Sequence, residues 1–147
     1  MNKKAAVLVC VTGQHDCDRL IRVGKDLAEE KSVSLQVLCV QPTSSGFEAD
    51  GEELEYLRQT ARDAKAEMTV YFDDEAPIVA VGFAKQMGAV QIVTGMAEAP
   101  VNGFVELIHK LLPSIPIAMV AKDGVVYNIC PVDKKSKKAV HTYGIDT

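Results

Sequence analysis

The sequence predicts an α/β domain: an open, mostly parallel sheet of five strands with helices on both faces, and one more antiparallel strand at its C-terminal edge. Two observations predict this fold class. Along residues 1–120, near-continuous apolar runs alternate with stretches of helical periodicity, which is typical of βαβ units around a parallel sheet. After them, Asp123-Gly124 separates two strand-like runs, which is a strong signal for a hairpin. The 147 residues predict a single domain at 1–130 and a polar, lysine-rich tail at 131–147.

The predicted strands are the apolar runs bounded by turn residues. They cover residues 5–12, 34–40, 68–72, 90–94, 115–120 and, beyond the hairpin turn, 125–130. Four helices are predicted between the first five strands, with acidic starts at Asp16, Asp50 and Asp73-Asp74-Glu75. Pro77 stands early in the third helix, and the fourth is expected at residues 104–112. The first helix should end near Ser32 and the third at Gly88.

The composition is that of an ordinary globular protein, with 48% hydrophobic residues, 24% charged residues and a net charge of −4. No apolar run reaches the length of a membrane span, and the negative charge disfavours nucleic acid as a partner. The first apolar run is too short and too interrupted to be the core of a signal peptide. We therefore expect a cytoplasmic protein that does not contact a membrane.

Gly95 closes the fourth predicted strand, and Phe104 opens the fourth predicted helix. Ligands of open α/β sheets bind at the carboxyl ends of the strands, where helix N-termini point. Residues 95–104 are therefore expected to form one wall of any small-molecule site.

Four segments of the chain resemble the universal stress protein family. They are VLVCVTG (7–13), DRLIRVGKDLAEE (18–30), FDDEAPIVAVGFAKQMGAVQIVTG (72–95) and FVELIHKLLPSIPIAMV (104–120). The sequence is most similar to the stress-protein-like domain of potassium-responsive sensor histidine kinases. This resemblance implies a five-stranded parallel sheet of the adenine nucleotide α-hydrolase type and a homodimer. It also implies that ATP or AMP could bind through glycines after the fourth strand.

Transferred to this chain, the nucleotide pocket would comprise Thr12, Gly13, Val40, Gly95, Met96, Asn102, Gly103 and Phe104. The chain departs from the family motif, G-x2-G-x9-G-[ST], in several places. Glu98 stands at the second glycine, Phe104 replaces the hydroxyl residue, and the loop is several residues shorter. Thr12-Gly13 stands where many members carry an aspartate. Since an exposed carboxylate would offset the ~0.3–1 kcal/mol by which a helix N-terminus attracts phosphate, no resident cofactor is expected.

We therefore expect a regulatory domain rather than an enzyme: a stress-protein-like unit with a degenerate nucleotide loop, acting by self-association and by docking a partner protein. An adenine-nucleotide binder, including a slow ATPase, is the first alternative. A thiol-based redox or metal sensor built on Cys10, Cys17 and Cys39 is the second. Reduced, buried thiols are the simpler interpretation of these cysteines.

Other residues that carry chemistry have simpler structural interpretations. His15, Asp16 and Cys17 are consecutive, and three consecutive side chains rarely converge on one metal ion. Asp73 and Asp74 are interpreted as helix caps, and His109 as a hydrogen-bonded structural histidine. The lysines of the tail, Lys134, Lys135, Lys137 and Lys138, are interpreted as a solvated charge run.

The predicted hairpin bears on the homodimer. An exposed edge strand is a template for pairing, so the fifth strand needs a cover. If strand 125–130 pairs with the fifth strand of its own chain, it becomes the new edge of the sheet. The homodimer interface is then expected between Ile117 and Cys130.

Overall fold

The computed structural model describes residues 5–12, 17–43, 51–96 and 103–131. These residues form one sheet in the order β3-β2-β1-β4-β5-β6. Neighbouring strands from β3 to β5 are parallel, and β6 is antiparallel to β5. The predicted fold class is confirmed, including the antiparallel strand at the C-terminal edge.

The strands are β1 (Ala6–Val11), β2 (Ser34–Gln41), β3 (Glu67–Phe72), β4 (Ala89–Gly95), β5 (Ile117–Val120) and β6 (Val126–Ile129). The helices are α1 (Asp18–Lys31), α2 (Gly51–Asp63), α3 (Ala76–Met87) and α4 (Phe104–Leu111). The strand boundaries agree with the predicted ones to within two residues. β5 begins two residues late, after Pro116, which has no N–H to give to a ladder but accepts a hydrogen bond from the Ile92 N–H at 3.0 Å.

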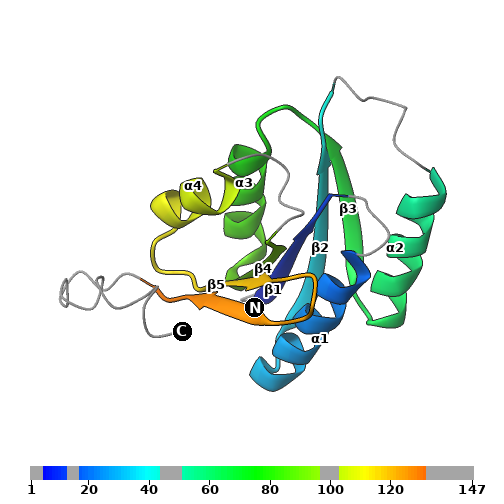
Figure 1. Ribbon diagram of the computed structural model, residues 1–147, viewed down its shortest axis with the longest axis horizontal. Helices are drawn as coiled ribbons and strands as arrows, with labels where there is room; N and C mark the ends of the chain where they lie inside the picture. The colour runs from blue at the N-terminus through cyan, green and yellow to red at the C-terminus, as the bar shows by residue number, and fades with distance from the viewer. Residues whose placement is uncertain (1–4, 13–16, 44–50, 97–102, 132–147) are drawn as a thin grey trace.

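Two hydrophobic clusters lie on opposite faces of the sheet. Along β1, Val7, Val9 and Val11 pack with α1 and α2, whereas Leu8 and Cys10 pack with α3 and α4. Figure 1 shows the two pairs of helices on either side of the sheet. Since every residue of β1 is buried, the strand reads in the sequence as a continuous apolar run.

The ends of α1 and α3 lie where the sequence predicts them. Ser32 and Gly88 follow these helices in the left-handed conformation, with φ of 59° and 67°, and their N–H groups bond back to the last turn. Within the described residues, no helix is long and apolar enough to span a bilayer.

The predicted capping of α3 by Asp73 and Asp74 is wrong. The N-cap residue is Glu75, and its side chain makes no capping bond. Asp73 Oδ1 accepts the Glu75 N–H at 2.7 Å, and Asp74 accepts the N–H and the hydroxyl of Thr43 at 2.9 and 2.7 Å. β3 runs beside β2, so the turn after β3 brings Asp74 to the end of its neighbour rather than to the helix. The caps predicted at Asp16 and Asp50 lie outside the described residues.

The Asp123-Gly124 hairpin is confirmed, with a three-residue loop at 122–124. Gly124 has a φ of 93°, a conformation that a side chain would strain, and its N–H donates to Ala121 O at 2.9 Å. The Ala121 N–H donates to Val125 O at 2.8 Å, and Asp123 Oδ1 accepts the Val125 N–H at 3.1 Å. These bonds fix the start of β6 beside β5.

Candidate functional site

The carboxyl ends of the parallel strands meet at one edge of the sheet, and the strand order reverses between β1 and β4. In open α/β sheets a ligand crevice forms at such a switch point. Thr12 directly follows β1, and Gly95 ends the adjacent β4. The fold thus brings two residues of the predicted nucleotide pocket, 83 positions apart in the sequence (95 − 12), to the two sides of the switch point.

The other predicted pocket residues differ in their surroundings. Met96 follows β4 and is 49% exposed, and Gly103 precedes α4 with a φ of 77°. Val40, on β2, and Phe104, the first residue of α4, are buried in the cluster beneath α3 and α4. The Phe104 side chain therefore packs in the core at the position where the family carries a hydroxyl. Gly13, Asn102 and Glu98 lie outside the described residues.

Gln41 is a buried polar residue of this region that the sequence analysis missed. Its Nε2 donates to Thr12 O at 2.5 Å and to Cys39 Sγ at 3.2 Å. The Thr12 hydroxyl lies 3.6 Å from Cys17 Sγ. Gln41 thus ties the end of β2 to the residue after β1. The signal available in the sequence was the side-chain amide of Gln41, which ends the apolar run SLQVLCVQ.

Arg19 is the second residue that sequence reasoning missed. It lies in the first turn of α1, where Nε donates to Ala121 O and Nη2 to Val120 O, both at 3.1 Å. The Val120 carbonyl also accepts the Met96 N–H at 3.1 Å. The end of β5 is therefore fixed both to α1 and to the residue that follows β4.

Thr94 Oγ1 and His109 Nδ1 are buried without a hydrogen-bond partner in the part of the chain that the structure describes. The prediction of a hydrogen-bonded His109 is wrong for this nitrogen. His109 lies one turn after Val105 on α4, and Val105 packs against the apolar cluster, so this face of the helix offers few polar neighbours.

The cysteines bear on the redox or metal sensor alternative. Burial raises the pKa of Cys10 to about 12, with a further contribution from Cys39. Burial also raises the pKa of Cys39, against the hydrogen bond from Gln41. Both thiols stay protonated at neutral pH, and the thiolate is the reactive form. Among the described residues, no group of three or more His, Cys, Asp or Glu side chains is placed to hold a metal ion.

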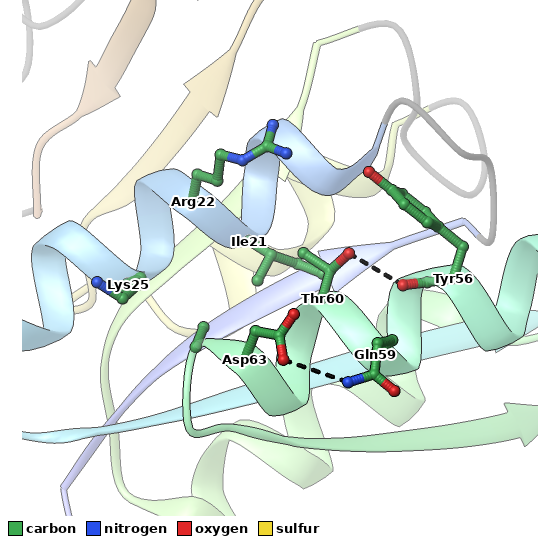
Figure 2. A pocket seen from close by; sticks show the side chains of 8 residues that line it. Ile21, Arg22, Lys25, Tyr56, Gln59, Thr60 and Asp63 are labelled. Carbon is green, nitrogen blue, oxygen red and sulfur yellow. Dashed lines mark hydrogen bonds between the residues drawn. The ribbon is translucent and has the colours of Figure 1, made fainter.

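A groove of about 360 Å³ lies between α1 and α2 and contains none of the predicted pocket residues (Figure 2). It is lined by Ile21, Arg22, Lys25, Tyr56, Gln59, Thr60, Asp63 and Ala64. The hydrogen bonds drawn in it stay within α2: Thr60 Oγ1 donates to Tyr56 O at 2.9 Å, and Gln59 Nε2 to Asp63 Oδ1 at 3.2 Å. The groove is thus the seam between two amphipathic helices, and the Tyr56 hydroxyl joins them by donating to Asp18 Oδ2 on α1 at 2.6 Å.

No protein-family model and no curated protein matches the sequence. Solved structures are similar in fold. A universal stress protein from Archaeoglobus fulgidus in complex with dAMP has a TM-score of 0.59 and 19% identity, over 81% of this chain and 98% of its own. A universal stress protein in complex with cAMP has a TM-score of 0.58 and 15% identity, over 82% and 99%. A macrolide-efflux protein from Streptococcus pneumoniae has a TM-score of 0.55 and 17% identity, over 82% and 46%.

At such identities the likeness concerns the fold, and a shared fold does not fix a function. The chain has the α/β fold of the universal stress proteins.

Proposed function

We propose that this chain is a regulatory domain without catalytic activity, which acts in the cytoplasm by self-association and by docking a partner protein. The observation that carries the proposal is the sixth strand. It covers the edge of β5, where the family fold ends, and presents an edge of its own. The sequence likeness to the stress-protein-like domain of sensor kinases supports a regulatory role.

No charged side chain protects the edge formed by β6, and among the described residues no further strand pairs with it. Val125, Val126 and Tyr127 are 47%, 38% and 38% exposed, and residues 125–131 include no charged side chain. Edge strands that stay unpaired are commonly blunted by charges, bulges or a covering loop. An uncharged edge of this kind supports pairing with another chain.

Sedimentation velocity on three forms of the protein tests this proposal. The full chain is expected to be a dimer, and a form truncated after Pro131 should remain one because it keeps β6. A form truncated after Lys122 should lose the dimer or aggregate, because it uncovers β5. A full chain that is monomeric at high micromolar concentration, or a dimer that survives truncation after Lys122, would contradict the proposal.

Binding of an adenine nucleotide is the second candidate function. It is favoured by the dAMP and cAMP complexes of two structural neighbours and by the position of Thr12 and Gly95 at the switch point. Micromolar binding of AMP or ATP in titration calorimetry would favour the nucleotide-binding function over a regulatory domain with a degenerate nucleotide loop.

A further inference from the structure

We infer that two copies of this chain join their β6 strands in antiparallel register, about a two-fold axis at Asn128, into one continuous sheet. The inference rests on the self-association proposed above and adds the surface, the partner and the register. Below, the β6 edge means the outer side of residues 126–130, turned away from β5.

The hairpin determines which backbone groups lie on the β6 edge. Ala121 and Val125 form a hydrogen-bonded pair at 2.8 Å, and in an antiparallel ladder such pairs alternate with non-bonded ones. Given the observed register, Tyr127 and Ile129 therefore turn their N–H and C=O groups toward β5.

Val126 and Asn128 consequently turn their N–H and C=O groups outward. Their partners on β5 are Val120 and Ala118, which are the non-bonded pairs of the ladder. The described residues provide no hydrogen-bond partner for these outward groups. A second strand is the natural way to satisfy such a row.

Only registers that set outward-facing residues opposite each other can form a ladder. With Asn128 opposite Asn128 of the second copy, Val126 of each copy faces Cys130 of the other, which makes three hydrogen-bonded pairs. A register in which the second strand is shifted by two residues toward the turn would need the Gly124 backbone for its outer hydrogen-bonded pairs. The Gly124 N–H is already donated to Ala121 O at 2.9 Å, so that register keeps fewer bonds.

The side chains of this register are compatible with a symmetric partner. Tyr127 of each copy lies opposite Ile129 of the other, on the face where Met119 and Ile129 pack against the α3–α4 cluster. Aromatic and β-branched residues form favourable cross-strand pairs. Because β6 carries no charge, the two copies set no like charges opposite each other.

The β6 edge is also held in place before it pairs. Arg19 fixes the carbonyls of Val120 and Ala121, and Asp123 fixes the Val125 N–H. A strand that is already ordered loses less conformational entropy when it pairs.

Cysteine cross-linking tests the register. In a Cys130→Ser background, Asn128→Cys should form an interchain disulfide under mild oxidation by copper phenanthroline and air, seen on a non-reducing gel. The Cα atoms of a bonded antiparallel pair lie about 5.5 Å apart, within the range of a disulfide. Tyr127→Cys in the same background is the matched control, because the register places it opposite Ile129 of the second copy. We expect about tenfold less cross-linking from it.

The outcomes separate the register from the self-association. More cross-linking at position 127 than at 128 would overturn the register. A dimer in sedimentation that cross-links at neither position would place the interface elsewhere and overturn the inference alone. A monomer in sedimentation would overturn the self-association itself. Circular dichroism on each variant establishes that the fold is kept.

Discussion

At Gly24 the helix α1 lies directly against side chains of the sheet. A methyl group at this position would overlap Val9 Cγ2 and lie 3.0 Å from Leu35 Cδ1, both in the core. Gly24→Ala should therefore destabilise the protein by about 1–3 kcal/mol, as overpacking does, although alanine is the better helix former. Urea denaturation at 25 °C measures the effect.

Gly82→Ala is the matched control for Gly24→Ala. Gly82 lies inside α3, and nothing is within 4 Å of an added methyl group. This change should stabilise the protein by about 0.5–1 kcal/mol through helix propensity alone. If the two substitutions changed the free energy of unfolding in the same direction, the close approach of α1 to β1 at Gly24 would be wrong.

The four cysteines should differ sharply in reactivity. Cys130 is exposed, whereas Cys10, Cys17 and Cys39 are buried. With Ellman's reagent at pH 8, we expect one thiol per folded chain to react rapidly and the other three only after denaturation. Burial withholds these thiols from the reagent, and the raised pKa of Cys10 and Cys39 withholds the thiolate.

Cys130→Ser is the control for the thiol measurement and should abolish the rapid phase. Reaction of Cys39 at the rate of Cys130 would show that β2 is open to solvent and would revive the thiol-sensor alternative. Such a result would also contradict the burial of β2 between two layers of helices.

At the scale of elements, the Arg19 side chain joins α1 to the hairpin of β5 and β6. Arg19→Met removes two charge-assisted hydrogen bonds to carbonyls and should cost about 1.5–3 kcal/mol for each bond that is not replaced by water. The backbone amides of β6 should exchange faster with deuterium, because the hairpin loses this anchor. Denaturation and hydrogen exchange measure the two effects.

Arg22→Met is the matched control, one turn along the same helix. Arg22 is largely exposed and pairs with Asp18 at 3.2 Å, a contact of the kind that contributes about 0–1 kcal/mol. This variant should leave exchange in β6 unchanged. Equal effects of the two substitutions would mean that Arg19 does not anchor the hairpin.

The helices and strands themselves could be predicted from the sequence, because each depends on the pattern of residues within a short stretch of the chain. The apolar run of β1 reflects burial on both faces, and Gly124 reflects a left-handed turn. The long-range ties could not be predicted. Asp74 binds Thr43, and Arg19 binds Val120, 101 residues away, because the strand order sets these segments side by side. Without the strand order, a carboxylate that precedes a helix is interpreted as a helix cap.

At the scale of the whole molecule, the strand order decides how much of the candidate site could be predicted. Glycine after an apolar run and the alternation of elements were enough to place Thr12 and Gly95 at carboxyl ends. Their meeting at the switch point follows from β1 lying beside β4. The burial of Phe104 could not be predicted from the neighbouring sequence, because it depends on α3 and α4 packing on the same face of the sheet.

The same arrangement leads to a prediction about nucleotide binding. The Phe104 side chain is 1% exposed and fills the core, so the start of α4 offers no hydroxyl to a phosphate there. With ATP and magnesium, titration calorimetry should show no binding tighter than about 0.1 mM, roughly −5.5 kcal/mol.

The sequence of the loop gives a second arm to this experiment. Glu98→Gly restores a family glycine and removes a carboxylate, yet it should improve the affinity little, because the loop is also shorter than in the family and Phe104 remains. A strong gain on this one change would mean that charge repulsion alone weakens the site. A micromolar dissociation constant for the unaltered chain, or ATP that co-purifies with it, would show that the loop is not degenerate. The adenine-nucleotide function would then replace the regulatory domain that acts without a nucleotide.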